Sequence, residues 1–127
     1  MANLLDTHAF LWFIFDDPRL SERALQSLQT EAPIHLSVVS LWEIAIKVNL
    51  RKLRLGMPFE RFVRSFVEAR QINVVGIELA HLVVFSGLPL HHRDPFDRLL
   101  IAQSKVEGFS VVTRDQRFEE YSVPVIW

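Results

Sequence analysis

The sequence contains no cysteine. Disulfide bonds, thiolate metal sites and a cysteine nucleophile are therefore excluded, and we expect a protein of the reducing cytoplasm. Glycine is also scarce, with four residues in 127, whereas half of the residues are hydrophobic and ten are phenylalanine. This composition is typical of a folded globular protein and not of a disordered one.

A long hydrophobic run is missing. The apolar stretch at residues 9–15 has about seven residues, well short of the ~20 that cross a bilayer. Asp6 stands just before it and no basic segment precedes it, so we expect neither a secretory signal nor membrane association.

Neither sign of charge is in excess, with 14 basic against 15 acidic residues. No global positive field attracts nucleic acid, so an RNA partner would need a local patch. The length suits one domain, and no repeat, low-complexity segment or linker divides the chain. We expect a single domain over residues 1–127.

Short apolar runs alternate with helical patterns, which is typical of βαβ units around a parallel sheet. Each run is rich in Leu, Ile or Val, as a strand covered on both faces requires. The fold class is therefore expected to be α/β. The predicted strands are Asn3 to Leu5, Ile34 to Val38, Asn73 to Ile77, Phe109 to Thr113 and Pro124 to Ile126.

Apolar residues at helical spacing predict amphipathic helices around residues 41–48 and over residues 59–67. Ser21 is the expected N-cap of a helix that runs to about Thr30. The segment Pro95 to Glu107 starts with proline and ends at glycine, as helices commonly do. Its centre is apolar nearly all round, so we expect this helix to be the most deeply buried.

Acidic residues stand where predicted strands end and helices begin. Asp6 follows the first strand, Glu43 lies in the first turn of the next helix, and Asp115 comes two residues after the fourth strand. Asp94 and Asp97 stand at the start of the buried helix. The carboxyl ends of parallel strands share one edge, where ligands bind, so we expect these side chains to converge there.

Converging carboxylates repel one another, and some would take up protons unless a cation were bound. All-oxygen ligation suits Mg²⁺ or Mn²⁺ better than zinc. Such a cation can activate water and stabilise charge on a phosphodiester. The acids therefore predict a hydrolytic metal site, with one or two ions.

Each acidic residue also has a purely structural interpretation. Ser40-Leu41-Trp42-Glu43 matches a capping box, in which Glu43 reaches back to the Ser40 amide. Asp115 fits an ordinary turn, and Asp6 fits a cap at the end of a strand. These interpretations explain the acids one at a time and not their common edge.

Two acids compete for one place in the site. Asp94, just before Pro95, is the better N-cap. Asp97 then occupies the third helical position, where an acid also favours the helix dipole. This argument favours Asp97 as the ligand and keeps Asp94 as an additional candidate.

Four stretches together resemble the PIN-domain ribonucleases, and specifically the VapC-type toxins of bacterial toxin–antitoxin pairs. They are LLDTHAFLWF, SLWEIAIK, LPLHHRDPFDRLLIAQ and VVTRDQRFEEYSVPVIW. Their order and spacing agree with the family from the first predicted strand to the last residue. The resemblance implies a three-layer α/β/α sandwich with a short, mostly parallel sheet of four or five strands.

The resemblance also implies an activity: a metal-dependent endoribonuclease that uses Mg²⁺ or Mn²⁺ to hydrolyse RNA. The matching catalytic and metal-binding acids are Asp6, Glu43, Asp97 and Asp115. Thr7 and Thr113 match polar positions beside the metal.

VapC-type toxins act as homodimers and are held inactive by a cognate antitoxin, so the resemblance implies both partners. Residues 10–15 form a helix too apolar to face water on any side. We expect part of it to pack on the sheet and the rest to join a dimer or antitoxin interface. The alternative is a helix buried throughout.

A basic stripe is a candidate path for RNA. Lys47, Arg51 and Arg54 follow Glu43 at spacings of four, four and three, which places them all on one helical face. A solvated charged face, with Lys47 paired to Glu43, is the alternative.

Other basic residues stand beside the acids. The arginines would pair with the acids or contact RNA. The two histidines are interpreted first as loop residues, with proton transfer as the alternative, because a metal-activated water needs no histidine. They are Arg93, Arg98, Arg114, Arg117, His91 and His92.

Two other classes of function remain. A phosphoryl-accepting regulatory or phosphatase-like domain would need a second Asp two residues after Asp6, but position 8 is His. A catalytically inactive interaction module would not need the complete set of acids. We rank both below the ribonuclease.

Overall fold

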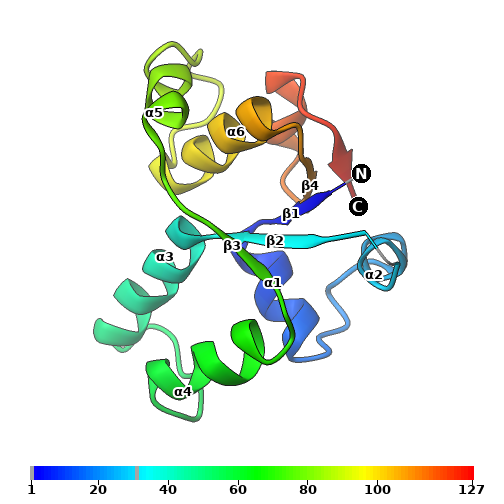
Figure 1. The fold of residues 1–127 in the computed structure, drawn as a ribbon, viewed down its shortest axis with the longest axis vertical. Helices are drawn as coiled ribbons and strands as arrows, with labels where there is room; N and C mark the ends of the chain where they lie inside the picture. Colours follow the sequence, from blue (N-terminus) through cyan, green and yellow to red (C-terminus); the bar gives the residue numbers. More distant parts are fainter. Residues whose placement is uncertain (1, 31) are drawn as a thin grey trace.

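The computed structural model describes residues 2–30 and 32–127 (Figure 1). Its centre is one parallel sheet of five strands in the order β3-β2-β1-β4-β5. All five predicted strands are confirmed; the first has the predicted bounds, and the others are one or two residues shorter. They are β1 (Asn3–Leu5), β2 (Ile34–Ser37), β3 (Asn73–Val75), β4 (Ser110–Val112) and β5 (Val125–Ile126).

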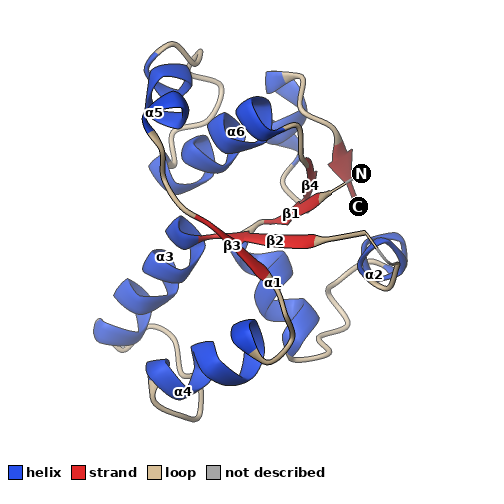
Figure 2. Cartoon of the chain, in the orientation of Figure 1, coloured by secondary structure: helices blue, strands red, loops and turns tan. Residues whose placement is uncertain are grey.

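Helices cover both faces of the sheet, as Figure 2 shows. On one side lie α1 (Thr7–Ile14), α3 (Val38–Asn49), α4 (Phe59–Val63) and a π-helical turn at Arg64–Glu68. On the other lie α5 (Leu79–Ser86), α6 (Pro95–Glu107) and a 3₁₀ helix, η2 (Gln116–Tyr121). Helix α2 (Glu22–Leu28) precedes β2, with Ser21 as its N-cap.

Neighbouring residues of β1 separate the two halves of the core. Leu4 packs with Leu100 and Phe118, whereas Leu5 packs with Phe10 and the helices of the opposite layer. Successive side chains of a strand point to opposite faces, so a strand that is apolar throughout needs a layer on each side. This arrangement confirms the three-layer α/β/α sandwich.

Helix α6 has the predicted bounds and ends. The Asp94 side chain accepts hydrogen bonds from the amides of Phe96 and Asp97, and Gly108 closes the helix in a left-handed conformation at φ 76°. Residues 98–104 are buried. Asp94 is therefore the N-cap, as expected, and the helix is packed deeply.

Helix α3 starts earlier than a capping box at Ser40 requires. Its N-cap is Ser37, whose hydroxyl accepts from the amide of Val39. Ser40 and Glu43 lie inside the helix and are buried. The capping-box interpretation of Glu43 is wrong, because the backbone turns into the helix directly after β2.

The first helix packs on the sheet with part of its surface, as expected. Phe10 and Ile14 belong to the core, and Leu11 and Phe13 pack against it. Phe15, just after the helix, is 46% exposed.

Helix α5 lies where no helix is predicted from the sequence. Leu79 and Val83 are 81% and 71% exposed, although both are apolar. Because hydrophobic residues occupy its outer face as well as its inner one, the segment has no amphipathic period to reveal it.

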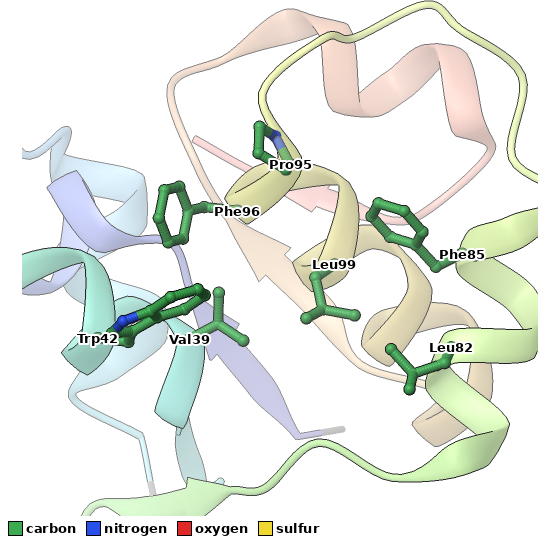
Figure 3. Close-up of a pocket in the computed structure, with 7 residues that line it drawn as sticks. All are labelled: Val39, Trp42, Leu82, Phe85, Pro95, Phe96 and Leu99. Atoms are coloured by element: carbon green, nitrogen blue, oxygen red, sulfur yellow. The ribbon is translucent and has the colours of Figure 1, made fainter.

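An apolar groove of about 200 Å³ runs between α3, α5 and α6 (Figure 3). Trp42 forms one edge and packs edge-on against Phe96, with ring centroids 5.2 Å apart. The lining residues are Val39, Trp42, Leu82, Phe85, Pro95, Phe96 and Leu99. The residues that line the groove include no acid or base for hydrolysis.

Among residues 2–30 and 32–127, no helix is long and apolar enough to cross a membrane.

Candidate active site

The predicted acids meet at the carboxyl edge of the sheet. Asp6, Asp94, Asp97 and Asp115 line an open hollow of about 500 Å³. Glu43 lies close enough for its charge to act on Asp97. The convergence expected from the parallel topology is therefore present.

Asp6 is buried and firmly held. As N-cap of α1, it accepts from the Ala9 amide through Oδ1 at 2.8 Å. Its Oδ2 accepts from the Thr113 hydroxyl at 2.6 Å. Burial raises the pKa of Asp6, while the hydrogen bonds from Thr113 and Ala9 oppose that rise. Asp6 is thus both a structural cap and a member of the acidic cluster.

Glu43 is buried on α3 and held from two sides. Its Oε1 accepts from the Thr7 hydroxyl at 2.7 Å, and that hydroxyl lies 3.0 Å from Oγ of Ser40. Its Oε2 pairs with Nζ of Lys47 at 3.0 Å. Thr7 therefore holds Glu43, as Thr113 holds Asp6.

Asp115 caps η2 and is surrounded by donors. Oδ1 accepts from the amide and Nε of Arg117, and Oδ2 lies 2.8 Å from Nε2 of His92. Burial alone would raise the pKa of Asp115, but the hydrogen bonds from Arg117 and His92 outweigh it and lower the pKa. This carboxyl is held as an anion.

Asp97 lies in the most negative surroundings. Burial and the charges of Asp94, Asp6, Glu43 and Asp115 together raise its pKa to about 8. Asp94, by contrast, is occupied by the amides that it caps. The surroundings of Asp97 are those that a cation would relieve.

The structure brings His92 into the site, although the sequence ranks it first as a loop residue. It does lie in the loop before α6, but it is 2% exposed, and its Nε2 lies 3.1 Å from Oδ2 of Asp97. The signal in the sequence is a pair of histidines just before the N-cap of α6. The pair does not show that His92 is buried while its neighbour His91 is exposed.

The four arginines have different surroundings. Arg98 is buried and donates to the carbonyl oxygens of Pro89 and His92. The expectation that it pairs with an acid or contacts RNA is therefore wrong; it shapes the loop before α6. Arg117 pairs with Asp115, and Arg114 lines the hollow. Arg93 is exposed.

The basic stripe does not continue along one helical face. Helix α3 ends at Asn49, and Arg51 has a left-handed backbone with φ 58°. Arg51 and Arg54 thus lie beyond the helix, and Lys47 is paired with Glu43. The expectation of a basic stripe on one helical face is wrong, because the helix ends before it reaches Arg51 and Arg54.

Aromatic rings form one wall of the hollow. His8 and Trp12 line it, with ring centroids 5.8 Å apart and an interplanar angle of 28°. Trp127 packs on Trp12 at 5.8 Å, and the Arg19 guanidinium lies 5.1 Å from the centroid of the same ring. Acidic, basic and aromatic groups therefore share one opening.

Known proteins with similar sequences or folds agree with this arrangement. A family model described as PIN domain matches residues 4–124. Ribonuclease VapC22 of Mycobacterium tuberculosis is 27% identical over 122 residues, which are 95% of this chain and 92% of that protein.

Two solved structures share the fold. FitAcB from Neisseria gonorrhoeae is 19% identical, with a TM-score of 0.67 over 97% of this chain and 95% of that one. DNA-bound VapBC from Salmonella typhimurium is 17% identical, with a TM-score of 0.69 over 98% and 96% of the two chains. With its family model matched over nearly the whole chain and its acids at one edge of the sheet, this chain belongs to the PIN domain family.

Proposed function

We propose that this protein is a Mg²⁺- or Mn²⁺-dependent endoribonuclease and the toxin of a toxin–antitoxin pair. One observation carries the hydrolytic part: Asp97 lies among the carboxylates of Asp6, Glu43 and Asp115 at an open hollow. The similarity to a ribonuclease of the VapC group supports RNA as the substrate.

The donor set fits a hard divalent cation. The cluster offers carboxylate oxygens, and the raised pKa of Asp97 reflects its burial together with negative charge that is not compensated. When bound, the cation would lower the pKa of a water molecule and stabilise negative charge on the phosphate. We assign Asp6, Glu43, Asp97 and Asp115 as its candidate ligands, with Asp94 as the cap.

The remaining side chains orient those acids. Thr113 holds Asp6 and Thr7 holds Glu43, so each carboxylate keeps its direction before substrate arrives. Arg117 holds Asp115 through its backbone amide and its guanidinium. Fixed carboxylates lower the reorganisation that the reaction requires.

The hollow also offers groups suited to RNA. Arg114 and Arg117 supply positive charge beside the acids, and Arg–phosphate contact is a common mode of binding. The exposed ring of His8, which is stacked on Trp12, can support a base. We propose that RNA enters here rather than along Lys47, Arg51 and Arg54.

The partners are proposals as well. The solved relatives include toxin–antitoxin complexes, and we propose a cognate antitoxin for this chain. We also propose a homodimer that packs at the apolar groove, where Trp42 and Leu82 are 58% and 46% exposed. A single domain acting in the cytoplasm is consistent with both proposals.

The test compares purified wild-type protein with Asp6→Asn on single-stranded RNA. We expect cleavage with Mg²⁺ or Mn²⁺, none with EDTA, and a loss of about 100-fold or more in Asp6→Asn, because the variant lacks one of the negative ligands. Asp16→Asn is the matched control, because Asp16 is exposed and lies outside the hollow.

Two results would remove the proposal. One is full activity of folded Asp6→Asn. The other is cleavage that persists in EDTA. Absence of cleavage by the wild-type protein on every RNA tested would favour the inactive interaction module.

A further inference from the structure

His92 lies between two acids of the candidate site. Its Nε2 is 2.8 Å from Oδ2 of Asp115 and 3.1 Å from Oδ2 of Asp97. One ligand atom from each of His92, Asp97 and Asp115 lies within 4.8 Å of the other two, a spacing compatible with a shared metal ion. Whether His92 binds a metal or holds the acids depends on which ring nitrogen carries the proton.

The other ring nitrogen decides that question. The backbone amide of Asp94 donates to Nδ1 of His92 at 3.1 Å. A nitrogen that accepts an N–H has no proton of its own, so the neutral ring must carry its proton on Nε2. A protonated Asp97 could donate to Nε2 only if Nδ1 bore the ring proton, and the Asp94 amide prevents that.

The orientation of the ring is itself fixed. His92 is 2% exposed and meets the Phe118 ring edge-on at 6.1 Å. Its amide donates to the Tyr121 hydroxyl at 2.8 Å, and its carbonyl accepts from Nη1 of Arg98 at 3.1 Å. Backbone and side chain are both anchored, so Nε2 points steadily at the two carboxyls.

We propose that His92 is a positioning residue that uses its Nε2–H to hold Asp97 and Asp115 together, and that it is not itself a metal ligand. A metal ligand needs a lone pair, and Nε2 has none in this tautomer. A single N–H shared between two carboxylate oxygens draws side chains from α6 and from the loop after β4 toward one cation. The inference rests on the proposed metal-dependent function.

The first test is spectroscopic and uses wild-type protein loaded with Mn²⁺. Pulsed EPR detects the nuclear coupling of an imidazole nitrogen bound directly to Mn²⁺. We expect no such coupling from His92. A direct nitrogen coupling that disappears in both His92→Gln and His92→Asn would overturn the inference.

The second test separates the two ring nitrogens by substitution. Gln places an N–H near the position of Nε2, whereas Asn can accept from the Asp94 amide but does not reach the carboxyls. We expect His92→Gln to bind Mn²⁺ within about 3-fold of wild type, and His92→Asn to bind about 10-fold more weakly or worse. Titration calorimetry measures both affinities.

The control is His91→Asn, since His91 is the exposed neighbour, and its affinity should equal that of the wild type. Wild-type affinity in His92→Asn, or a 10-fold loss in folded His92→Gln, would overturn the inference while the proposed function stood. Should His92→Asn fail to fold, the wild-type spectrum and His92→Gln still decide. A wild-type protein that neither binds Mn²⁺ nor cuts RNA would remove the proposed function, and this inference with it.

Discussion

The hydroxyl of Thr113 donates a 2.6 Å hydrogen bond to Oδ2 of Asp6, across 107 positions of sequence. The same hydroxyl accepts from the amide of Asp115 at 3.0 Å. The sheet register explains the contact, because Leu5 pairs with Val112 and the next residue of each strand then lies side by side. One hydroxyl therefore connects the acids that follow two neighbouring strands.

Replacing Thr113 by Val should weaken both stability and metal binding. The buried carboxyl of Asp6 would lose a donor, which should lower the free energy of unfolding by about 1–3 kcal/mol. Affinity for Mn²⁺ should fall about 10-fold, as is typical for partners of ligands. Urea denaturation and calorimetry measure the two effects. Thr30→Val, at an exposed position, is the control; equal behaviour of the two variants would contradict the role given to Thr113.

The pKa of Asp97 predicts a pH dependence of the metal-free protein. Because the folded state raises this pKa from 3.8 to about 8, the folded protein holds a proton that the unfolded chain releases. The stability that this proton supplies is present below about pH 4 and is lost as the pH rises through about 8.

Asp97→Asn removes the titrating carboxyl, and with it the loss of stability at high pH. In EDTA at about pH 8, the variant should be more stable than wild type by about 1–2 kcal/mol, and the difference should shrink toward about pH 4. Thermal unfolding across the pH range measures it. Added Mg²⁺ should stabilise the wild type and not the variant. A difference that is independent of pH would show that Asp97 does not titrate as described.

The affinity of the protein for RNA should depend on Arg114 more than on Arg54. Arg114 lines the hollow, whereas Arg54 lies beyond the end of α3. In the Asp6→Asn background, Arg114→Ala should weaken RNA binding by about 5-fold or more. It should also reduce the slope of log affinity against log salt concentration by about one. Fluorescence anisotropy at several salt concentrations measures both. A larger effect of Arg54→Ala would restore the basic stripe as the RNA path.

A charged side chain introduced into the apolar groove should dissociate the proposed homodimer into monomers. Leu82 lines the groove and is 46% exposed. Leu82→Glu should convert dimer to monomer at micromolar concentration, because burying an unpaired carboxylate at an interface is costly. Light scattering after gel filtration measures the mass. Val106→Glu, on an exposed part of α6 outside the groove, is the control. A monomeric wild type would refute the homodimer.

Much of the fold was open to prediction, because its signals lie between near neighbours in sequence. The helix after Asp94 is defined by its cap, by the proline that follows and by Gly108. The strands show as short apolar runs, since residues on both faces of a covered sheet must be buried. Asp6 and Asp115 could be located because Asp6 follows a strand directly and Asp115 comes a few residues after one.

Other features depended on where the backbone turns and on contacts between distant segments. The N-cap of α3 at Ser37 excluded the capping box, and the end of α3 at Asn49 interrupted the basic stripe. Arg98 became a buried anchor because loop carbonyls surround it. No periodicity within the sequence encodes these partners.

The sequence by itself determined the strands, the buried helix and the chemical types at the edge of the sheet, because periodicity, caps and turns act over a few residues. The tertiary structure decided how those types interact. It placed Asp97 among other carboxyls, brought the hydroxyl of Thr113 into hydrogen bond with Asp6, and buried His92 rather than His91. The physical reason is that the charge felt by a side chain, and the donor it meets, depend on strand register and loop packing across the whole chain.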